Sequence, residues 1–351
     1  MLFAVSHSDD RLERARQHYS SAHSISYQQT AYYPIPDVDI VDSAEMSVLI
    51  LTPGQSEYQF RVTRGEVDEV YQDGVFSEVR HTEKAYYRYE NPENQKNYLS
   101  TSNLSKYGPV ALLKHQWDYV NDTLLQGQSH AHFMRVEKAW EYEGKQIVVE
   151  HHIFLSPSDL LIRFERRNHV DGVLTQTVTY RYGDYRFDED VLSANASAPE
   201  RYSLKYFERA DKLKALEKGA KAPDFEAIDT RTNAVSFGKA PRKQTLLLFG
   251  SITCGYSQLV IDHISQTGFR LKEEVDMFTF LGSDSQDRAI KYLDRFPLAG
   301  SVIADRRDIE TAYGIAGYPI LYLVDQNGIV VESLAGSEGI VEFIDELAVV
   351  K

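Results

Sequence analysis

The single cysteine of the chain, Cys254, lies where a buried strand is expected to pass into a helix. The run before it, 245–249 (TLLLF), is short and continuously apolar, as in a strand covered on both faces. A helical pattern follows from about Cys254 to Arg270. Free backbone N–H groups and the positive dipole end at such a helix start stabilise a thiolate, the form that attacks disulfides and peroxides. The position therefore suits redox chemistry.

A second group, Gly317-Tyr318-Pro319-Ile320, opens another expected strand. Proline has no N–H for the strand ladder and is tolerated at a strand start or edge. Most lone cysteines are small buried apolar residues, and this interpretation of Cys254 stays open. The strand-to-helix junction and the proline loop together favour an active-site position, which is not the same as turnover.

Four motifs occur in the order found in thioredoxin-fold proteins of the TlpA and AhpC/TSA (redoxin) type, which residues 219–351 resemble. The motifs are Ala222-Pro223-Asp224-Phe225, Cys254-Gly255-Tyr256-Ser257, Gly317-Tyr318-Pro319 and Val324-Asp325-Gln326-Asn327-Gly328. The resemblance implies a thioredoxin-like α/β domain in which Cys254 attacks and Pro319 is a cis-proline facing it. It implies substrate binding by Gly255, Tyr256, Tyr318 and Pro319, with Tyr318 offering backbone hydrogen bonds to an extended substrate.

The main departure from that family is Ser257, which replaces the second cysteine of a CxxC pair. A serine oxygen can hydrogen-bond a thiolate but cannot release a mixed disulfide. Natural monothiol character and a Cys-to-Ser change made to trap a complex both explain it. The peroxidase version of the fold has a proline where Leu247 stands, although Ser251 fits its Thr/Ser position. A one-Cys thiol peroxidase is therefore the weaker alternative.

The first part of the chain predicts a helix followed by antiparallel strands. Residues 8–22 suit a helix with Ser8 or Asp9 as N-cap. Apolar and polar residues then alternate, as in 57–63, which places one face of a sheet on a core. Asp-Gly pairs at 73–74 and 171–172 are strong hairpin signals, and 133–187 is expected to form a meander of long strands.

A helix followed by a long meander resembles the LolA/LppX-type half-barrel, which carries lipoproteins or lipids outside the cytoplasm. The resemblance implies an apolar face under the helix that would hold acyl chains or an apolar peptide. An ordinary filled β core, rich in tyrosine and phenylalanine because these residues suit strands, explains the pattern equally.

The sequence thus predicts two domains. Residues 1–210 form an α+β antiparallel half-barrel with a helix, and 219–351 form an α/β thioredoxin-like domain. A loop at 194–199 and a short helix at 210–218 separate them. Strand and helix patterns alternate in the second domain and predict a sheet covered by helices.

Composition excludes several other functions. The chain has 351 residues, with 38 basic and 52 acidic side chains and a net charge of −14, so it lacks the cationic field that nucleic acid requires. One cysteine permits no intramolecular disulfide and no multi-cysteine zinc site. His151 and His152 are adjacent on an expected strand and point to opposite faces, so we expect no metal, and no cofactor motif is present. No apolar run reaches the length of a membrane span.

Two functions remain. In the first, Cys254, with Ser257 beside it, exchanges disulfides with a protein client, and an external thiol reductant completes the cycle. In the second, the protein is redox-inactive and its N-terminal half-barrel holds a lipid, a lipoprotein or an apolar peptide. Both resemblances imply an extracytoplasmic location, in the bacterial periplasm, although the MLFAVSHSDD start is not an intact signal peptide.

Overall fold

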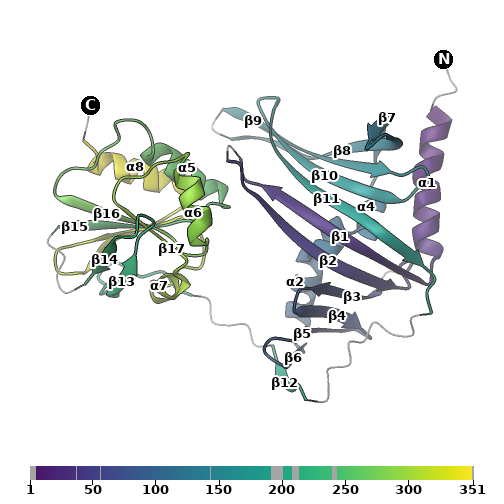
Figure 1. Cartoon of the computed structure of the whole chain (residues 1–351), viewed down its shortest axis with the longest axis horizontal. Helices are drawn as coiled ribbons and strands as arrows, with labels where there is room; N and C mark the ends of the chain where they lie inside the picture. The colour runs from purple at the N-terminus through teal and green to yellow at the C-terminus, as the bar shows by residue number, and fades with distance from the viewer. Residues whose placement is uncertain are drawn as a thin grey trace. The chain divides into compact units, whose positions relative to one another are not determined.

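The structure, a computed structural model, describes residues 5–36, 38–55, 57–142, 144–190, 201–207, 213–238 and 243–349. The chain divides into two compact units, Met1–Arg209 and Ala210–Lys351 (Figure 1). The predicted loop at 194–199 and the start of the predicted helix at 210–218 lie outside the described residues. Among the described residues, none of the helices has the length and apolarity needed to cross a bilayer.

The first unit consists of one large sheet and four helices among its described residues. Helix α1 (Val5–Ser21) precedes the sheet, and α2 (Pro92–Thr101), α3 (Asn103–Tyr107) and α4 (Pro109–Leu113) follow its sixth strand. The strands are β1 (Ser24–Pro34), β2 (Val41–Leu51), β3 (Gln59–Arg64), β4 (Val67–Gln72), β5 (Val75–Arg80), β6 (Ala85–Tyr89), β7 (Asp118–Leu125), β8 (Gln128–Tyr142), β9 (Lys145–Leu155), β10 (Leu161–Val170), β11 (Val173–Phe187) and β12 (Ser203–Tyr206).

The sheet runs in the order β12-β6-β5-β4-β3-β2-β1-β11-β10-β9-β8-β7. Its neighbours are antiparallel except β12 and β6, which are parallel. The predicted meander is confirmed, because β8, β9, β10 and β11 pair in succession. Asp73-Gly74 and Asp171-Gly172 form the expected hairpin turns with positive φ at both residues. The predicted N-cap is wrong, because α1 begins at Val5 and includes Ser8 and Asp9.

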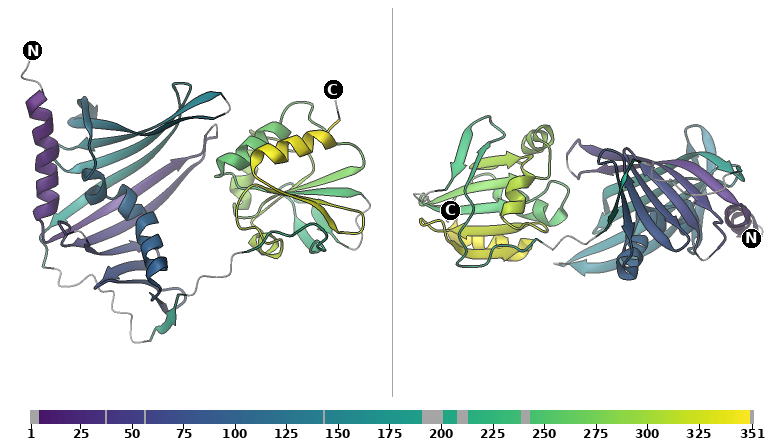
Figure 2. Two further views of the ribbon diagram at one scale, coloured as in Figure 1. Left: turned by 180° about the vertical axis from the view of Figure 1, so that it is seen from behind. Right: turned by 90° about the horizontal axis from the view of Figure 1, so that it is seen from below.

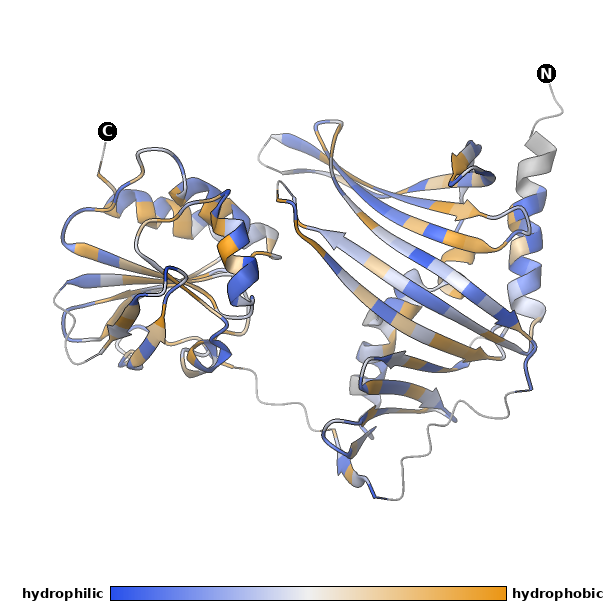
Figure 3. Ribbon diagram, in the orientation of Figure 1, coloured by the Kyte–Doolittle hydropathy of each residue, from blue (hydrophilic) through white to orange (hydrophobic). Residues whose placement is uncertain are grey.

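Alternation along the strands separates two faces of this sheet (Figure 3). On β1, Ile25 and Tyr27 are buried in a core that also contains Tyr19 of α1 and Leu112 of α4. Burying such a side chain contributes about 1.5–3 kcal/mol, which is why the helices pack on this face. We call the opposite side the open face; it carries Ser26 and Gln28 of β1, Arg163 of β10 and Arg181 of β11.

The second unit has an α/β arrangement. A hairpin of β13 (Phe225–Ile228) and β14 (Ala234–Phe237) precedes a sheet that runs, among described strands, β17-β16-β15-β18-β19. Its strands are β15 (Gln244–Phe249), β16 (Val275–Leu281), β17 (Ser301–Ala304), β18 (Ile320–Val324) and β19 (Val330–Ala335), and its helices are α5 (Gly255–Ile264), α6 (Gln286–Leu293), α7 (Arg307–Ala312) and α8 (Ser337–Leu347). β15, β16 and β17 are parallel, whereas β18 is antiparallel to β15 and to β19.

Strand β15 is central and buried on both faces, as its apolar run predicts. Leu247 and Phe249 join a core with Phe225 of β13 and Tyr313, which follows α7. Helices α5 and α8 lie side by side (Figure 2). The loop that follows the carboxyl end of β15 is therefore anchored to a strand packed in the core on both faces.

Two predicted helices need correction. Residues 213–217 have no regular secondary structure and 218–219 form a turn. The backbone N–H of Leu216 donates to the Tyr322 hydroxyl at 3.0 Å, so this segment is held by the core and not by helical bonds. Helix α5 ends at Ile264, short of the predicted Arg270, and Gly268 adopts φ +89° soon after.

Candidate active site

Cys254 is the N-cap residue of α5, directly before the first helical turn. Its φ and ψ are −96° and 114°, an extended conformation, so the chain turns from strand to helix at this residue. The side chain is partly exposed, and the Cys254 thiol lies 3.6 Å from the backbone carbonyl oxygen of Tyr318. The two loops that the sequence singled out, around residues 254 and 318, thus meet at the sulfur.

Ser257 lies in the first turn of α5 and is 1% exposed. Its hydroxyl oxygen accepts a hydrogen bond from the backbone N–H of Ser251 at 3.2 Å. Ser251 in turn lies 3.1 Å from the Thr253 hydroxyl. Ser257 therefore holds the loop that precedes Cys254, a role that needs an acceptor atom and no redox chemistry.

The loop facing Cys254 contains a cis peptide bond between Tyr318 and Pro319. Pro319 is buried and Tyr318 is half-buried. In the first turn of α5, Gly255 is exposed and Tyr256 is 60% exposed. Leu259 of the same helix is also exposed, so α5 presents Tyr256 and Leu259 as accessible apolar side chains.

Two buried carboxylates hold the two loops, and neither was singled out from the sequence. Asp284, 4% exposed, accepts from the backbone N–H of Ile252 at 3.0 Å. Glu310 of α7, 6% exposed, accepts from the Tyr318 hydroxyl at 2.9 Å. An isolated acid following a strand, or in a helix of mixed composition, carries no sequence signal that separates it from a solvated one.

Burial governs the protonation of this second pair. Loss of solvent raises the pKa of the Glu310 carboxyl above its usual range, and the Tyr318 hydrogen bond offsets part of the rise. Burial likewise raises the pKa of Tyr318 to about 12. The phenol therefore stays protonated and donates throughout the neutral range.

No histidine whose side chain the structure describes is bonded to Cys254, Ser257 or Tyr318. His263, in the last turn of α5, pairs with Asp345 of α8 at 2.7 Å. His151 and His152 do point to opposite faces: His151 packs edge-on against core Phe164, and His152 lies 2.9 Å from His132. Among the described residues, no group of three or more His, Cys, Asp or Glu could hold a metal ion.

Comparison with known proteins covers about a third of the chain. No family model matches. The thioredoxin-like protein YneN of Bacillus subtilis is 22% identical over 125 residues, which is 35% of this chain and 74% of that protein. The thiol-disulfide oxidoreductase ResA of Bacillus thuringiensis is 26% identical over 131 residues, 37% of this chain and 75% of ResA. A part of the chain is a thioredoxin-fold domain of the TlpA/redoxin type.

Solved structures similar to this thioredoxin-like domain carry related descriptions. A putative thiol:disulfide interchange protein DsbE from Chlorobium tepidum shares 23% identity, with a TM-score of 0.33, over 38% of this chain and 96% of its own. A peroxiredoxin-like protein from Aquifex aeolicus shares 16% identity, also with a TM-score of 0.33, over 38% of this chain and 90% of its own. The curated matches support a fold like that of the thiol-disulfide oxidoreductases.

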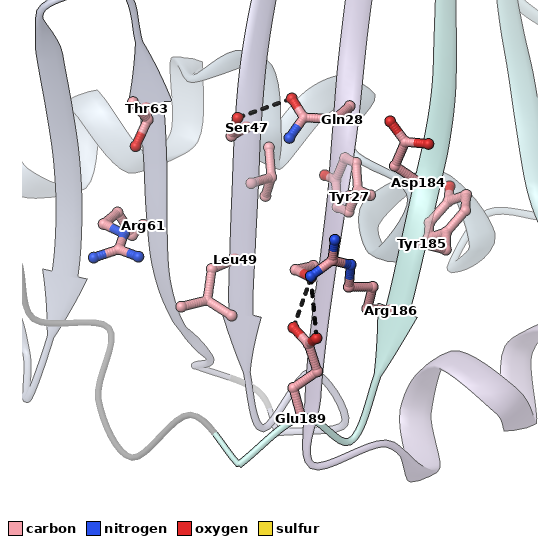
Figure 4. A pocket seen from close by; sticks show the side chains of 12 residues that line it. Tyr27, Gln28, Ser47, Leu49, Arg61, Thr63, Asp184, Tyr185, Arg186 and Glu189 are labelled. Atoms are coloured by element: carbon pink, nitrogen blue, oxygen red, sulfur yellow. Dashed lines mark hydrogen bonds and ion pairs between the residues drawn. The ribbon is translucent and has the colours of Figure 1, made fainter.

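Several depressions lie on the first unit, and two of them concern the apolar and polar faces of its sheet. One, of about 410 Å³, has a mixed lining: aromatic and aliphatic side chains, among them Phe60, Tyr71 and Leu99, stand beside polar ones such as Glu57 and Lys114. The other, of about 480 Å³, is lined mainly by polar residues of β1, β2, β3 and β11 on the open face. In the second, Gln28 bonds Ser47 and Arg186 pairs with Glu189 (Figure 4).

Proposed function

We propose that the thioredoxin-like domain performs thiol–disulfide exchange on a protein client through the single thiol of Cys254. The observation that supports this most directly is the placement of Cys254 at the start of α5, 3.6 Å from the Tyr318 carbonyl beside the cis Tyr318–Pro319 bond. A client strand beside Pro319 could pair with the Tyr318 backbone and bring its own sulfur to Cys254. Tyr256, Leu259 and Tyr318 are the side chains that such a strand would cover.

The reaction balances with an external reductant. The Cys254 thiolate attacks one sulfur of a client disulfide, which forms a mixed disulfide and releases the client's other sulfur as a thiolate. One thiol of the reductant then attacks the Cys254 sulfur and frees the reduced client. A second reductant thiol displaces Cys254 and closes the reductant's disulfide, so two electrons pass from reductant to client. Ser257 forms no bond in any step.

The test uses the fact that Cys254 is the sole cysteine. Its rate of alkylation by iodoacetamide at neutral pH is measured in the native chain and in the same chain unfolded in urea. Because a helix start stabilises the thiolate, we expect the native chain to react faster. Incubation with a peptide disulfide should then yield one mixed disulfide per chain, which Cys254→Ser abolishes. A native rate no higher than the unfolded rate contradicts the proposal.

We propose as a second candidate that the first unit, as a half-barrel of the LolA/LppX type, binds an apolar ligand such as an acyl chain. The depression beside Leu99 supports it, because Tyr58, Phe60 and Tyr71 line its walls and Lys114 stands over the Tyr58 ring at 5.7 Å. The walls also carry Glu57, two serines and His115, so the aromatic and aliphatic part suits an apolar chain and Lys114 is the group that could meet an anionic end. Both functions belong outside the cytoplasm, as the two family resemblances imply.

A fluorescent long-chain fatty acid tests this candidate. Leu99→Gln places a polar amide in the depression and should weaken binding of the probe. Leu124→Gln, at a leucine 74% exposed on β7, is the matched control and should not. Equal weakening by both variants, or no saturable binding to the purified chain after delipidation, rejects the acyl-chain site.

A further inference from the structure

A third depression, of about 530 Å³, lies on the open face of the first unit. The turn between β7 and β8 contributes Gln126, β8 contributes Gln128 and His130, and β10 and β11 contribute Arg163 and Arg181. These residues come from three separate segments of the chain, so the fold gathers them. None of the residues that line this depression is an aspartate or a glutamate.

The two arginines occupy directly opposite positions in the ladder between β10 and β11. Like charges placed opposite each other on one face of an antiparallel pair destabilise the sheet. Glu165 offsets part of this charge: it pairs with Arg163 and, at 2.6 Å, with Arg167. One carboxylate thus serves two guanidinium groups, and the Nε of Arg163 is buried without a hydrogen-bond acceptor among the described residues.

Arg181 is the less compensated of the two. Its guanidinium lies 5.1 Å from the centre of the Tyr32 ring, and within the described part of the chain no carboxylate lies within ion-pair distance of it. Arg186, on the same strand β11, lines the depression of Figure 4 and differs from Arg181 in having a carboxylate partner. There Arg186 pairs with Glu189 at 3.4 Å, and Asp184 also lines the wall.

We propose that the depression beside Arg181 binds an oxyanion group, a phosphate or a carboxylate, carried by a small molecule. Arg163 and Arg181 supply charge-assisted hydrogen bonds, and the side-chain amides of Gln126 and Gln128 supply neutral donors. The ligand's charge relieves the repulsion between the arginines. A chain with a net charge of −14 repels anions overall, so binding depends on this local cluster. The site is independent of Cys254 chemistry.

Isothermal titration calorimetry of the full chain with inorganic phosphate, and separately with succinate, tests the site in a chloride buffer of low ionic strength. We expect saturable binding of at least one probe. Arg181→Gln should weaken it about tenfold or more, because a charge-assisted bond is lost. Arg186→Gln, the matched arginine of the charge-balanced depression, should leave the affinity within about twofold. Added salt should weaken binding.

The outcomes separate the ligand sources. Binding of phosphate alone identifies a phosphoryl ligand, binding of succinate alone a carboxylate, and binding of both the shared oxyanion chemistry. Binding of neither probe overturns the proposal, as does equal weakening by Arg181→Gln and Arg186→Gln. If Arg181→Gln does not fold, Arg181→Lys replaces it as the test. Lysine keeps the charge and loses the planar fork of the guanidinium, so this variant should bind the probe with an affinity below that of the wild type.

Discussion

Removing the Tyr318 hydroxyl should destabilise the second unit and leave the first unit unchanged. In Tyr318→Phe the buried Glu310 carboxyl loses its 2.9 Å donor while the ring packing stays. Leaving a buried acceptor without its partner costs about 1–3 kcal/mol. The double variant Tyr318→Phe/Glu310→Met removes the acceptor as well and should recover most of that stability, because paired deletion leaves no unsatisfied group.

The pH dependence of this loss has a definite sign. Burial raises the pKa of Glu310 in the folded state above its unfolded value. The contribution of this group to the free energy of unfolding is therefore fully present below the unfolded pKa. It is lost as the pH rises through the folded pKa. The Tyr318 hydrogen bond opposes that rise. Without it the folded pKa climbs further, and the stability gap between wild type and Tyr318→Phe should widen as the pH increases.

The chain permits separate readouts of its two units. Cys254 is the only cysteine and lies in the second unit, so pulsed thiol labelling in urea follows the unfolding of that unit. Both tryptophans, Trp117 and Trp140, lie in the first unit and report on it by fluorescence. With a urea slope of about 1–3 kcal/mol per molar, Tyr318→Phe should lower the labelling midpoint by roughly 1 M. An unchanged labelling midpoint, a gap that narrows with pH, or an equal shift in fluorescence would refute this reasoning.

Three further perturbations probe the second unit. Ser257→Cys should form a disulfide with Cys254 on mild oxidation, which mass spectrometry detects as a loss of two hydrogens. If both thiols can still be alkylated after that oxidation, the CxxC-like geometry is contradicted. Asp284→Ala removes the carboxylate that accepts from Ile252 and should lower the labelling midpoint by an amount corresponding to about 1–3 kcal/mol. Asp294→Ala, at an exposed acid with helical backbone angles, is the control and should leave the midpoint unchanged. Gly314→Ala should destabilise this unit more than Gly336→Ala. Both glycines have positive φ, but a Cβ at Gly314 would overlap the Lys214 carbonyl, whereas a Cβ at Gly336 meets open space. Equal losses of stability in urea unfolding would show that backbone strain alone decides.

Local patterns predicted much of the fold because short-range physics dominates those elements. The Asp73-Gly74 and Asp171-Gly172 turns need positive φ, and few residue pairs accept it. The apolar run of β15 requires cover on both faces, which only a central strand receives. The strand-to-helix position of Cys254 followed from this apolar run and from the helical pattern after it.

Long-range contacts account for what the sequence did not predict. Residues 213–218 have helical composition, yet Leu216 donates to Tyr322 more than a hundred residues away, and that bond replaces a helical one. Asp284 and Glu310 have ordinary local sequences, and their roles depend on which backbone groups the fold brings beside them. Gly282 shows the same dependence, because a Cβ there would lie 2.7 Å from the Glu310 carboxyl carbon.

Geometry and turnover are separable at this site, and Ser257 is the residue that separates them. Its hydroxyl accepts from the Ser251 N–H and so holds the loop before Cys254. Asp284, which follows the carboxyl end of the neighbouring parallel strand β16, holds the same loop, and Glu310 holds the facing one. The Asp284 and Glu310 contacts involve neither position 254 nor position 257, so they hold the two loops whichever residue occupies the second position of the motif. Under the proposed function, such a site would hold its client as a mixed disulfide until another molecule supplies the second thiol.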